Sequence, residues 1–175
     1  MPRLRLILAT LAALLLCAAA PAPNPGTGPG PAVGSNTGLP VPRFVSLRSD
    51  DVNVRAGPGF QYPVNWVYKR AGLPVEIIGE FNVWRHIIAP DGGTGWLHEA
   101  TIRARRTFYV TATQAMLYSA PRQGANVVAY LDKGVTGDIL HCDGDSAFCK
   151  VKAGHKSGYL ARTDFWGTFP GETVK

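Results

Sequence analysis

The stretch Val52-Asn53-Val54-Arg55-Ala56-Gly57-Pro58-Gly59 decides the fold, because an alternating apolar strand runs directly into a turn rich in glycine and proline. A weaker copy, Ala115-Met116-Leu117-Tyr118-Ser119-Ala120-Pro121, follows downstream. Alternation of this kind predicts a strand with one buried face. Each copy is followed by an aliphatic strand, an aromatic strand and a strand that contains glycine, an aromatic residue and leucine. We therefore predict an all-β protein in which one small barrel is built twice.

The repeat continues along the whole unit, with equivalent residues 62 to 64 positions apart. The equivalent pairs are Asn53 and Met116, Val54 and Leu117, Gly72 and Gly134, Ile77 and Ile139, Trp84 and Phe148, and Trp96 and Tyr159. A match at nearly constant spacing marks an internal repeat. The expected strands are 44–49, 51–56, 64–69, 74–80, 83–89 and 94–98, then 108–112, 114–118, 127–131, 136–142, 147–152 and 157–161. The first barrel is thus expected over 44–107, and the second, with a C-terminal tail, over 108–175.

The N-terminus has the pattern of a secretory signal peptide. Arg3 and Arg5 precede an apolar run of about 11 residues, which is shorter than the roughly 20 that a spanning helix needs. Cleavage after Ala19 predicts a signal peptide over 1–19 and an exported protein without a transmembrane segment. Cys17 leaves a lipoprotein anchor open as an alternative, but the leucine before it favours ordinary cleavage.

Residues 20–43 are rich in proline, glycine and small polar residues, and we expect them to form a disordered linker. The full chain has 18 basic and 12 acidic residues, a net charge of +6; removal of Arg3 and Arg5 with the leader lowers this to +4. A charge of this size favours anionic partners without specifying one. No nucleic-acid motif is present, and none is expected in an exported protein.

Two cysteines, Cys142 and Cys149, remain after the leader. A hairpin loop between them would place the two residues opposite each other, and an even number in an exported chain favours a disulfide. A metal site with His141 and His155 is the alternative, although the spacing fits no familiar zinc pattern.

The first copy and its continuation, Tyr62-Pro63, residues 66–76 and Gly95-Trp96-Leu97-His98-Glu99-Ala100, resemble the bacterial SH3 domain. The resemblance continues into a tandem, exported SH3-like family whose second unit often carries a cysteine pair and ends as Trp166-Gly167-Thr168-Phe169-Pro170-Gly171-Glu172 does here. It implies two SH3-like barrels and a role in binding cell-wall peptides or proteins. The second unit has lost the Asn-x-Arg-x-Gly-Pro-Gly signature, so a ligand role of the first unit does not transfer to it.

Four residues of the first unit are candidate ligand contacts: Asn53, Arg55, Tyr62 and Trp66. The guanidinium of Arg55 suits a carboxylate, but it could equally hold a loop by pairing with Asp50, Asp51 or Glu76. Tyr62 and Trp66 have no aromatic counterpart in the second unit, which favours a groove over the core. Trp84 and Trp96 do have counterparts, and we expect them in the framework.

Two basic clusters, Lys69-Arg70 and Arg103 with Arg105 and Arg106, could contact an acidic polymer, but a charge run at a junction is more typical of a solvated connector. The tail from Phe165 to Pro170 is too apolar to stay in water and is expected to fold back. The histidines are scattered and no nucleophile motif is present, so we predict neither an enzyme nor a metal or cofactor site.

The sequence therefore predicts a non-catalytic periplasmic protein that binds peptidoglycan or another envelope ligand through its first barrel. The alternative is a module that recruits or regulates an envelope enzyme by binding it as a protein partner. The oligomeric state is left open.

Overall fold

The computed structural model describes residues 32–175. The expected signal peptide, Cys17 and the first part of the expected linker lie outside the described residues. Within residues 32–175, no helix is long and apolar enough to cross a bilayer.

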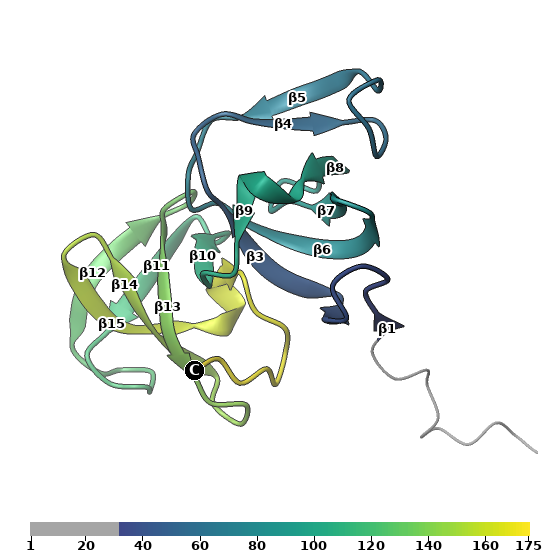
Figure 1. Ribbon diagram of the computed structural model, residues 1–175. Helices are drawn as coiled ribbons and strands as arrows, with labels where there is room; N and C mark the ends of the chain where they lie inside the picture. The colour runs from purple at the N-terminus through teal and green to yellow at the C-terminus, as the bar shows by residue number, and fades with distance from the viewer. Residues whose placement is uncertain (1–31) are drawn as a thin grey trace, which may run out of the picture. The chain divides into compact units, whose positions relative to one another are not determined.

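The fold consists of two antiparallel sheets of seven strands each and a two-stranded N-terminal hairpin, with two short 3-10 helices between strands (Figure 1). The first sheet contains β3 (Arg43–Leu47), β4 (Val52–Arg55), β5 (Val64–Tyr68), β6 (Pro74–Phe81), β7 (Trp84–Ile88), β8 (Thr94–His98) and β9 (Ile102–Arg103). The second contains β10 (Thr107–Val110), β11 (Gln114–Tyr118), β12 (Val127–Asp132), β13 (Thr136–Cys142), β14 (Phe148–Ala153), β15 (Lys156–Ala161) and β16 (Phe165–Trp166). The helices are η1 (Glu99–Thr101) and η2 (Arg162–Asp164). The predicted all-β architecture with two SH3-like barrels in tandem is confirmed.

The internal repeat is visible in the topology. The strand orders are β5-β4-β8-β7-β6-β3-β9 and β12-β11-β15-β14-β13-β10-β16, which are the same order in repeat-equivalent strands. Gly72 and Gly134 both have positive φ, 79° and 90°, and their amides donate to the equivalent carbonyls of Leu47 and Val110. Glycine adopts this left-handed conformation at little cost. The β4–β5 and β11–β12 pairs also share a register shift at corresponding points.

Each barrel has its own core. In the first, Val52 and Val54 are fully buried while Asn53 between them is exposed, as the alternation predicts. In the second, Leu117 takes the place of Val54 and is fully buried as well. Burying one such side chain contributes about 1.5–3 kcal/mol. Two small cores of this kind benefit from reinforcement.

The predicted disulfide reinforces the second barrel. Cys142 on β13 faces Cys149 on β14 in the strand register, and the two sulfurs are bonded. The bond is buried inside the second core, where both cysteines are at most 1% exposed. Val174 pairs with Cys142 from the other side, so the end of the chain is attached to the same strand.

The C-terminal tail folds back onto the first barrel, as its apolar composition predicts. The ring of Phe44 on β3 lies 5.2 Å from that of Trp166 and 4.7 Å from that of Phe169. The Arg106 guanidinium lies over the same Phe44 ring, 5.7 Å from its centroid. The tail therefore connects the two barrels through an aromatic cluster.

The expected disorder of residues 20–43 is wrong for the described part of that segment. Residues 32–41 form a hairpin of β1 (Ala32–Val33) and β2 (Pro40–Val41). Its turn is bound to the Glu80 carboxylate, which accepts the amides of Asn36 and Thr37 at 3.0 Å each and the Thr37 hydroxyl at 2.7 Å. Composition indicates how little apolar surface a segment can bury, but it does not show an acceptor more than forty residues away.

Candidate functional site

A shallow groove opens on the first barrel beside β4. It has a volume of about 100 Å³ and is lined by Asp51, Asn53, Arg55, Phe60, Trp84, His98 and Thr101. We call it the Phe60 groove. Asn53 and Arg55 line it because they share the side of β4 opposite the buried valines, and Asp51 directly precedes the strand.

Three rings in mutual contact form its apolar part. Phe60 is 72% exposed, yet its ring centroid lies 5.0 Å from Trp84 and 5.7 Å from His98. Trp84 and His98 meet edge to face at 5.4 Å. Trp84 is only 6% exposed, so it supports the other two rings from below. An exposed phenyl ring on a fixed aromatic base can contact a ligand without first losing mobility.

Arg55 shapes the edge of the groove. It donates to the carbonyls of Phe60 at 3.2 Å and Tyr62 at 2.7 Å, and its guanidinium lies 5.5 Å from the Phe60 centroid. The arginine thus holds the Gly-Pro-Gly loop, as one of the two sequence interpretations expects. It does so through backbone carbonyls, rather than through Asp50, Asp51 or Glu76.

The acidic neighbours of Arg55 have other partners. Asp51 pairs with Lys69, and Asp50 accepts the Ala71 amide at 2.7 Å. Asn53 is exposed, and its side chain has no hydrogen bond within residues 32–175. Its amide therefore keeps both donor and acceptor capacity toward the groove.

The other two predicted contacts lie elsewhere. The Tyr62 ring packs over Gly57, where an added Cβ would lie 2.5 Å from the ring. Trp66 faces Val54 across the β4–β5 pair, on the core side of the sheet, and its ring is 6.3 Å from that of Tyr68. Asn53 and Arg55 share the Phe60 groove, but Tyr62 and Trp66 do not line it.

The sequence interpretation missed the aromatic residues of the groove, which are Phe60, Trp84 and His98. Phe60 follows the Gly-Pro-Gly turn directly, and that position is itself a usable signal, because connecting segments lie at the protein surface. Trp84 was expected in the framework because Phe148 is its repeat equivalent. The structure shows that one ring can support the core and also form the base of a groove.

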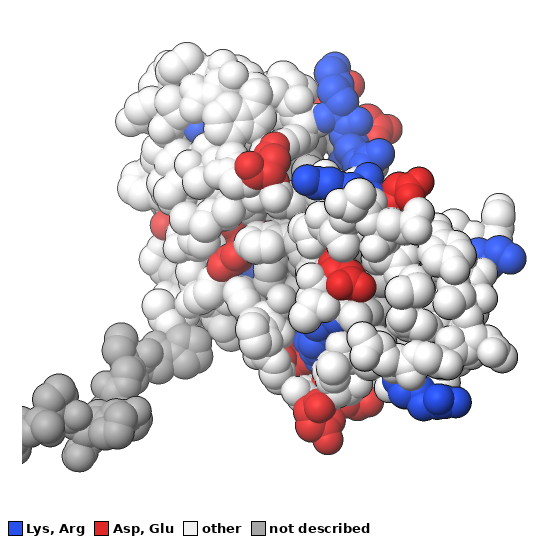
Figure 2. Space-filling view, turned by 180° about the vertical axis from the view of Figure 1, so that it is seen from behind, with Lys and Arg blue, Asp and Glu red and all other residues white. Residues whose placement is uncertain are grey.

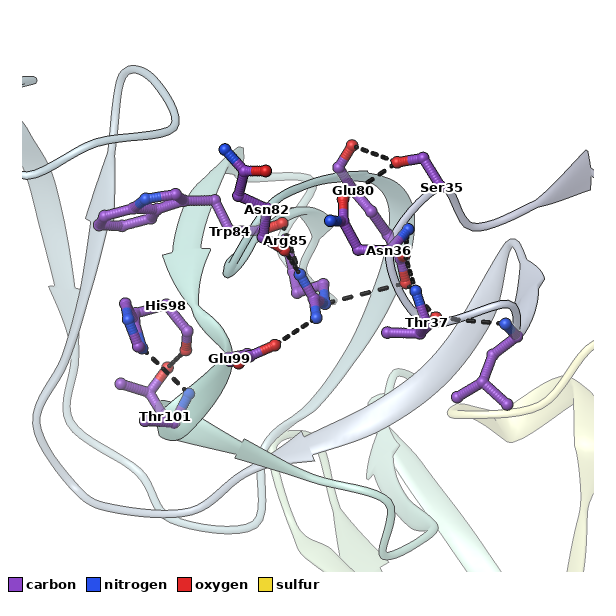
Figure 3. A network of polar contacts seen from close by, with 12 residues as sticks. Ser35, Asn36, Thr37, Glu80, Asn82, Trp84, Arg85, His98, Glu99 and Thr101 are labelled. Carbon is purple, nitrogen blue, oxygen red and sulfur yellow. Dashed lines mark hydrogen bonds and ion pairs between the residues drawn. The ribbon is translucent and has the colours of Figure 1, made fainter.

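A polar network fixes the groove from behind (Figure 3). The His98 Nδ1 accepts the Ala100 amide at 3.2 Å, and the Thr101 hydroxyl donates to the His98 carbonyl at 2.7 Å. The next residue, Glu99, pairs with the buried Arg85, whose Nε is 3.8 Å from Glu80. The N-terminal hairpin, through Glu80, and the groove, through His98, are therefore joined by one network.

The second barrel does not repeat this site. At the positions equivalent to Asn53, Arg55 and Trp84 stand Met116, Tyr118 and Phe148. The Tyr118 hydroxyl contacts the Met116 sulfur at 3.6 Å, and its ring lies 6.0 Å from Phe148. The polar edge of the first barrel is thus replaced by a thioether and a phenol.

Most of the arginines at the junction serve the fold. Arg106 donates to both Glu172 oxygens, at 2.6 and 2.9 Å, and to the Gly167 carbonyl at 2.8 Å. Arg105 pairs with Asp138. One face of the molecule nevertheless shows a strip of Lys and Arg with Asp and Glu beside it (Figure 2). The ion pairs of Arg105 and Arg106 favour the interpretation of the basic cluster as a connector between the barrels.

The residues of the alternative metal site, His141 and the two cysteines, have other partners within the described residues. Among residues 32–175, no three His, Cys, Asp or Glu side chains gather closely enough to hold a metal ion. His141 contacts Asp143 at 2.8 Å, while Cys142 is bonded to Cys149.

Residues 48–104 match the family model of the bacterial SH3 domain. No curated protein matches the chain. Solved structures of NlpC2 and NlpC1 from Trichomonas vaginalis match at 16% and 14% identity, with TM-scores of 0.34 and 0.32. The alignments cover 73% and 78% of this chain and 49% of each of those proteins, so this chain spans about half their length.

The family match contains every residue that lines the Phe60 groove, from Asp51 to Thr101. The matched domain is a binding domain and not a catalytic one. The fold and this match agree for the first barrel: residues 48–104 match the bacterial SH3 domain, and the second barrel repeats the same strand order.

Proposed function

We propose that the protein is a non-catalytic, periplasmic binding protein that recognises peptidoglycan through the Phe60 groove. The observation that carries the proposal is the exposed Phe60 ring, set against Trp84 and His98 with Arg55 and Asn53 at its edge. The first barrel matches the bacterial SH3 domain, which is a binding domain, and the secretory leader pattern supports export.

The chemistry of the groove suits a wall polymer. Aromatic faces contact the apolar faces of sugar rings and side chains, while the Asn53 amide and the free donors of Arg55 suit carboxylates and amides. A groove of about 100 Å³ takes one small group at a time, since pockets for drug-sized ligands are roughly 300–1,000 Å³. We therefore expect weak binding at each site, strengthened by the repetition of sites along a polymer.

The test is sedimentation of the chain from residue 20 with purified peptidoglycan. The expected result is saturable binding that Phe60→Ala weakens about tenfold, which is the effect expected of an aromatic anchor. The matched control is Tyr130→Ala. Tyr130 is an exposed aromatic residue of the second barrel, 62% exposed against 72% for Phe60.

Two results would contradict the proposal. Equal weakening by Phe60→Ala and Tyr130→Ala would show that the Phe60 groove is not the binding surface. No saturable binding would exclude peptidoglycan as the ligand and leave a protein partner for the groove.

A further inference from the structure

A second cavity lies where the two barrels meet. It has a volume of about 190 Å³ and is lined by Tyr68, Arg70, Leu73, Pro90, Asp91 and Tyr109. We call it the inter-barrel pocket. Tyr109 comes from β10 of the second barrel and also packs against the core of the first. The pocket is therefore complete only when both barrels are present, and it shares no residue with the Phe60 groove.

The acidic side of the pocket is held in a fixed position. The Asp91 carboxylate accepts the Tyr68 hydroxyl, at 2.9 and 3.2 Å to its two oxygens, and the Gly93 amide at 2.9 Å. A Cβ at Gly93 would lie 2.7 Å from the Tyr68 hydroxyl, so a larger residue there would have to displace this hydroxyl. Burial, together with the Asp91 carboxylate, raises the pKa of Tyr68 far above its usual value, which keeps the hydroxyl protonated as the donor.

The basic side is held by the second barrel. One terminal nitrogen of Arg70 donates to the Gly134 carbonyl. Within residues 32–175 the guanidinium has no other hydrogen bond and no acidic partner within 4.0 Å, so its remaining N–H groups are available. Arg70 and Asp91 thus line one small pocket without pairing with each other.

We propose that the inter-barrel pocket binds a zwitterionic amino-acid group, a carbon that bears both a free ammonium and a free carboxylate. The carboxylate binds Arg70, the ammonium binds Asp91, and the side chain lies between the rings of Tyr68 and Tyr109 above the buried Leu73. A group with a single charge meets one complementary side chain and one that repels it, whereas a zwitterion complements both.

The size of the pocket limits the ligand. At about 190 Å³ it lies below the roughly 300–1,000 Å³ of sites for drug-sized molecules. It therefore suits a free amino acid or one exposed amino-acid centre of a longer peptide. Arg70, Asp91 and the two tyrosines form this site by themselves, and binding there does not require that the Phe60 groove bind peptidoglycan.

The test is a titration of the ¹⁵N-labelled chain from residue 20 followed by amide chemical shifts. The probes are alanine, N-acetylalanine and alaninamide, which carry both charges, only the carboxylate and only the ammonium, respectively. Alanine is expected to shift the amides of residues 68–73 and 91–93 saturably, and each blocked probe is expected to bind about tenfold more weakly.

Two variants and a control localise the effect. Arg70→Gln and Asp91→Asn both change exposed side chains. Arg70→Gln is expected to abolish the preference for alanine over alaninamide, and Asp91→Asn the preference for alanine over N-acetylalanine. Arg122→Gln, an exposed arginine of the second barrel, is expected to leave the titration unchanged. Equal binding of the three probes, or the absence of saturable shifts at these amides, would overturn the proposal. Neither result would depend on peptidoglycan binding.

Discussion

Replacement of Glu80 by glutamine tests whether a buried carboxylate holds the N-terminal hairpin on the first barrel. The Glu80 side chain is fully buried and accepts the Thr37 hydroxyl, the backbone amides of Asn36 and Thr37, and an Arg43 N–H at 2.7 Å. Hydrogen bonds to a charged acceptor contribute about 1.5–3 kcal/mol each and are not additive. Glutamine keeps the shape, loses the charge and turns one acceptor into a donor.

We expect Glu80→Gln to lower the free energy of unfolding by about 3 kcal/mol, in the range for breaking a buried charge pair. For a protein of this size the melting temperature would fall by about 6 to 12 °C. The assay is urea unfolding of both proteins, together with hydrogen exchange at the Asn36 and Thr37 amides. Exchange at these amides should accelerate, because their acceptor is weakened.

The pKa of Glu80 determines how the stabilisation by this side chain depends on pH. Burial alone would raise the pKa of Glu80, but the hydrogen bonds from Thr37, Arg43 and the hairpin amides outweigh it and lower the pKa to about 2. The stabilisation is therefore complete above the unfolded pKa near 4.5 and is lost as the pH falls toward 2. The difference between wild type and Glu80→Gln should shrink over this window.

Glu76→Gln is the matched control. Burial raises the pKa of Glu76, and no hydrogen bond compensates it within residues 32–175. Removing its charge at neutral pH should therefore leave the protein equally or more stable. A pH-independent loss for Glu80→Gln, a loss below about 0.5 kcal/mol, or an equal loss for Glu76→Gln would refute the role assigned to Glu80.

Three further changes test other parts of the structure. Cys142→Ala with Cys149→Ala should destabilise the second barrel by about 2.5 kcal/mol, the chain-entropy value for a loop this short. Urea unfolding should show the same loss when the wild type is reduced, and no loss would mean that the bond is dispensable. Phe44→Ala removes the ring that contacts both Trp166 and Phe169, so it should lower the free energy of unfolding by about 3–5 kcal/mol and increase proteolysis of the tail. An unchanged digestion pattern would show that other contacts hold the tail. Gly134→Ala should cost about 1 kcal/mol in thermal unfolding because its φ is 90°, and a neutral result would show that the turn relaxes.

Local pattern was sufficient to predict the strands and the repeat. The alternation around Val54 and Leu117 follows from strand geometry alone, and both residues are fully buried in repeat-equivalent strands. The disulfide was predictable for a related reason, since a short hairpin places Cys142 opposite Cys149 whatever the rest of the chain does. Features that depend on neighbours in sequence could therefore be predicted.

The candidate site depends on contacts between distant segments, and only part of it was predictable. Asn53 and Arg55 line the Phe60 groove because they share one side of β4, which alternation specifies. Whether Trp66 lies in the groove depends on its partner across the sheet, Val54, which directs it toward the core side. Trp84 reaches the groove only because the loop that carries Phe60 folds over it.

The central claim is that the Phe60 groove binds peptidoglycan, and sedimentation of the mature chain with purified peptidoglycan across a salt series tests it most directly. At high salt the Debye length falls to about 3 Å, so attraction by net charge alone is screened. The account predicts saturable binding that persists at high salt and is weakened by Phe60→Ala but not by Tyr130→Ala. Loss of binding at moderate salt, with both variants equal to wild type, would show attraction by charge alone and contradict the claim.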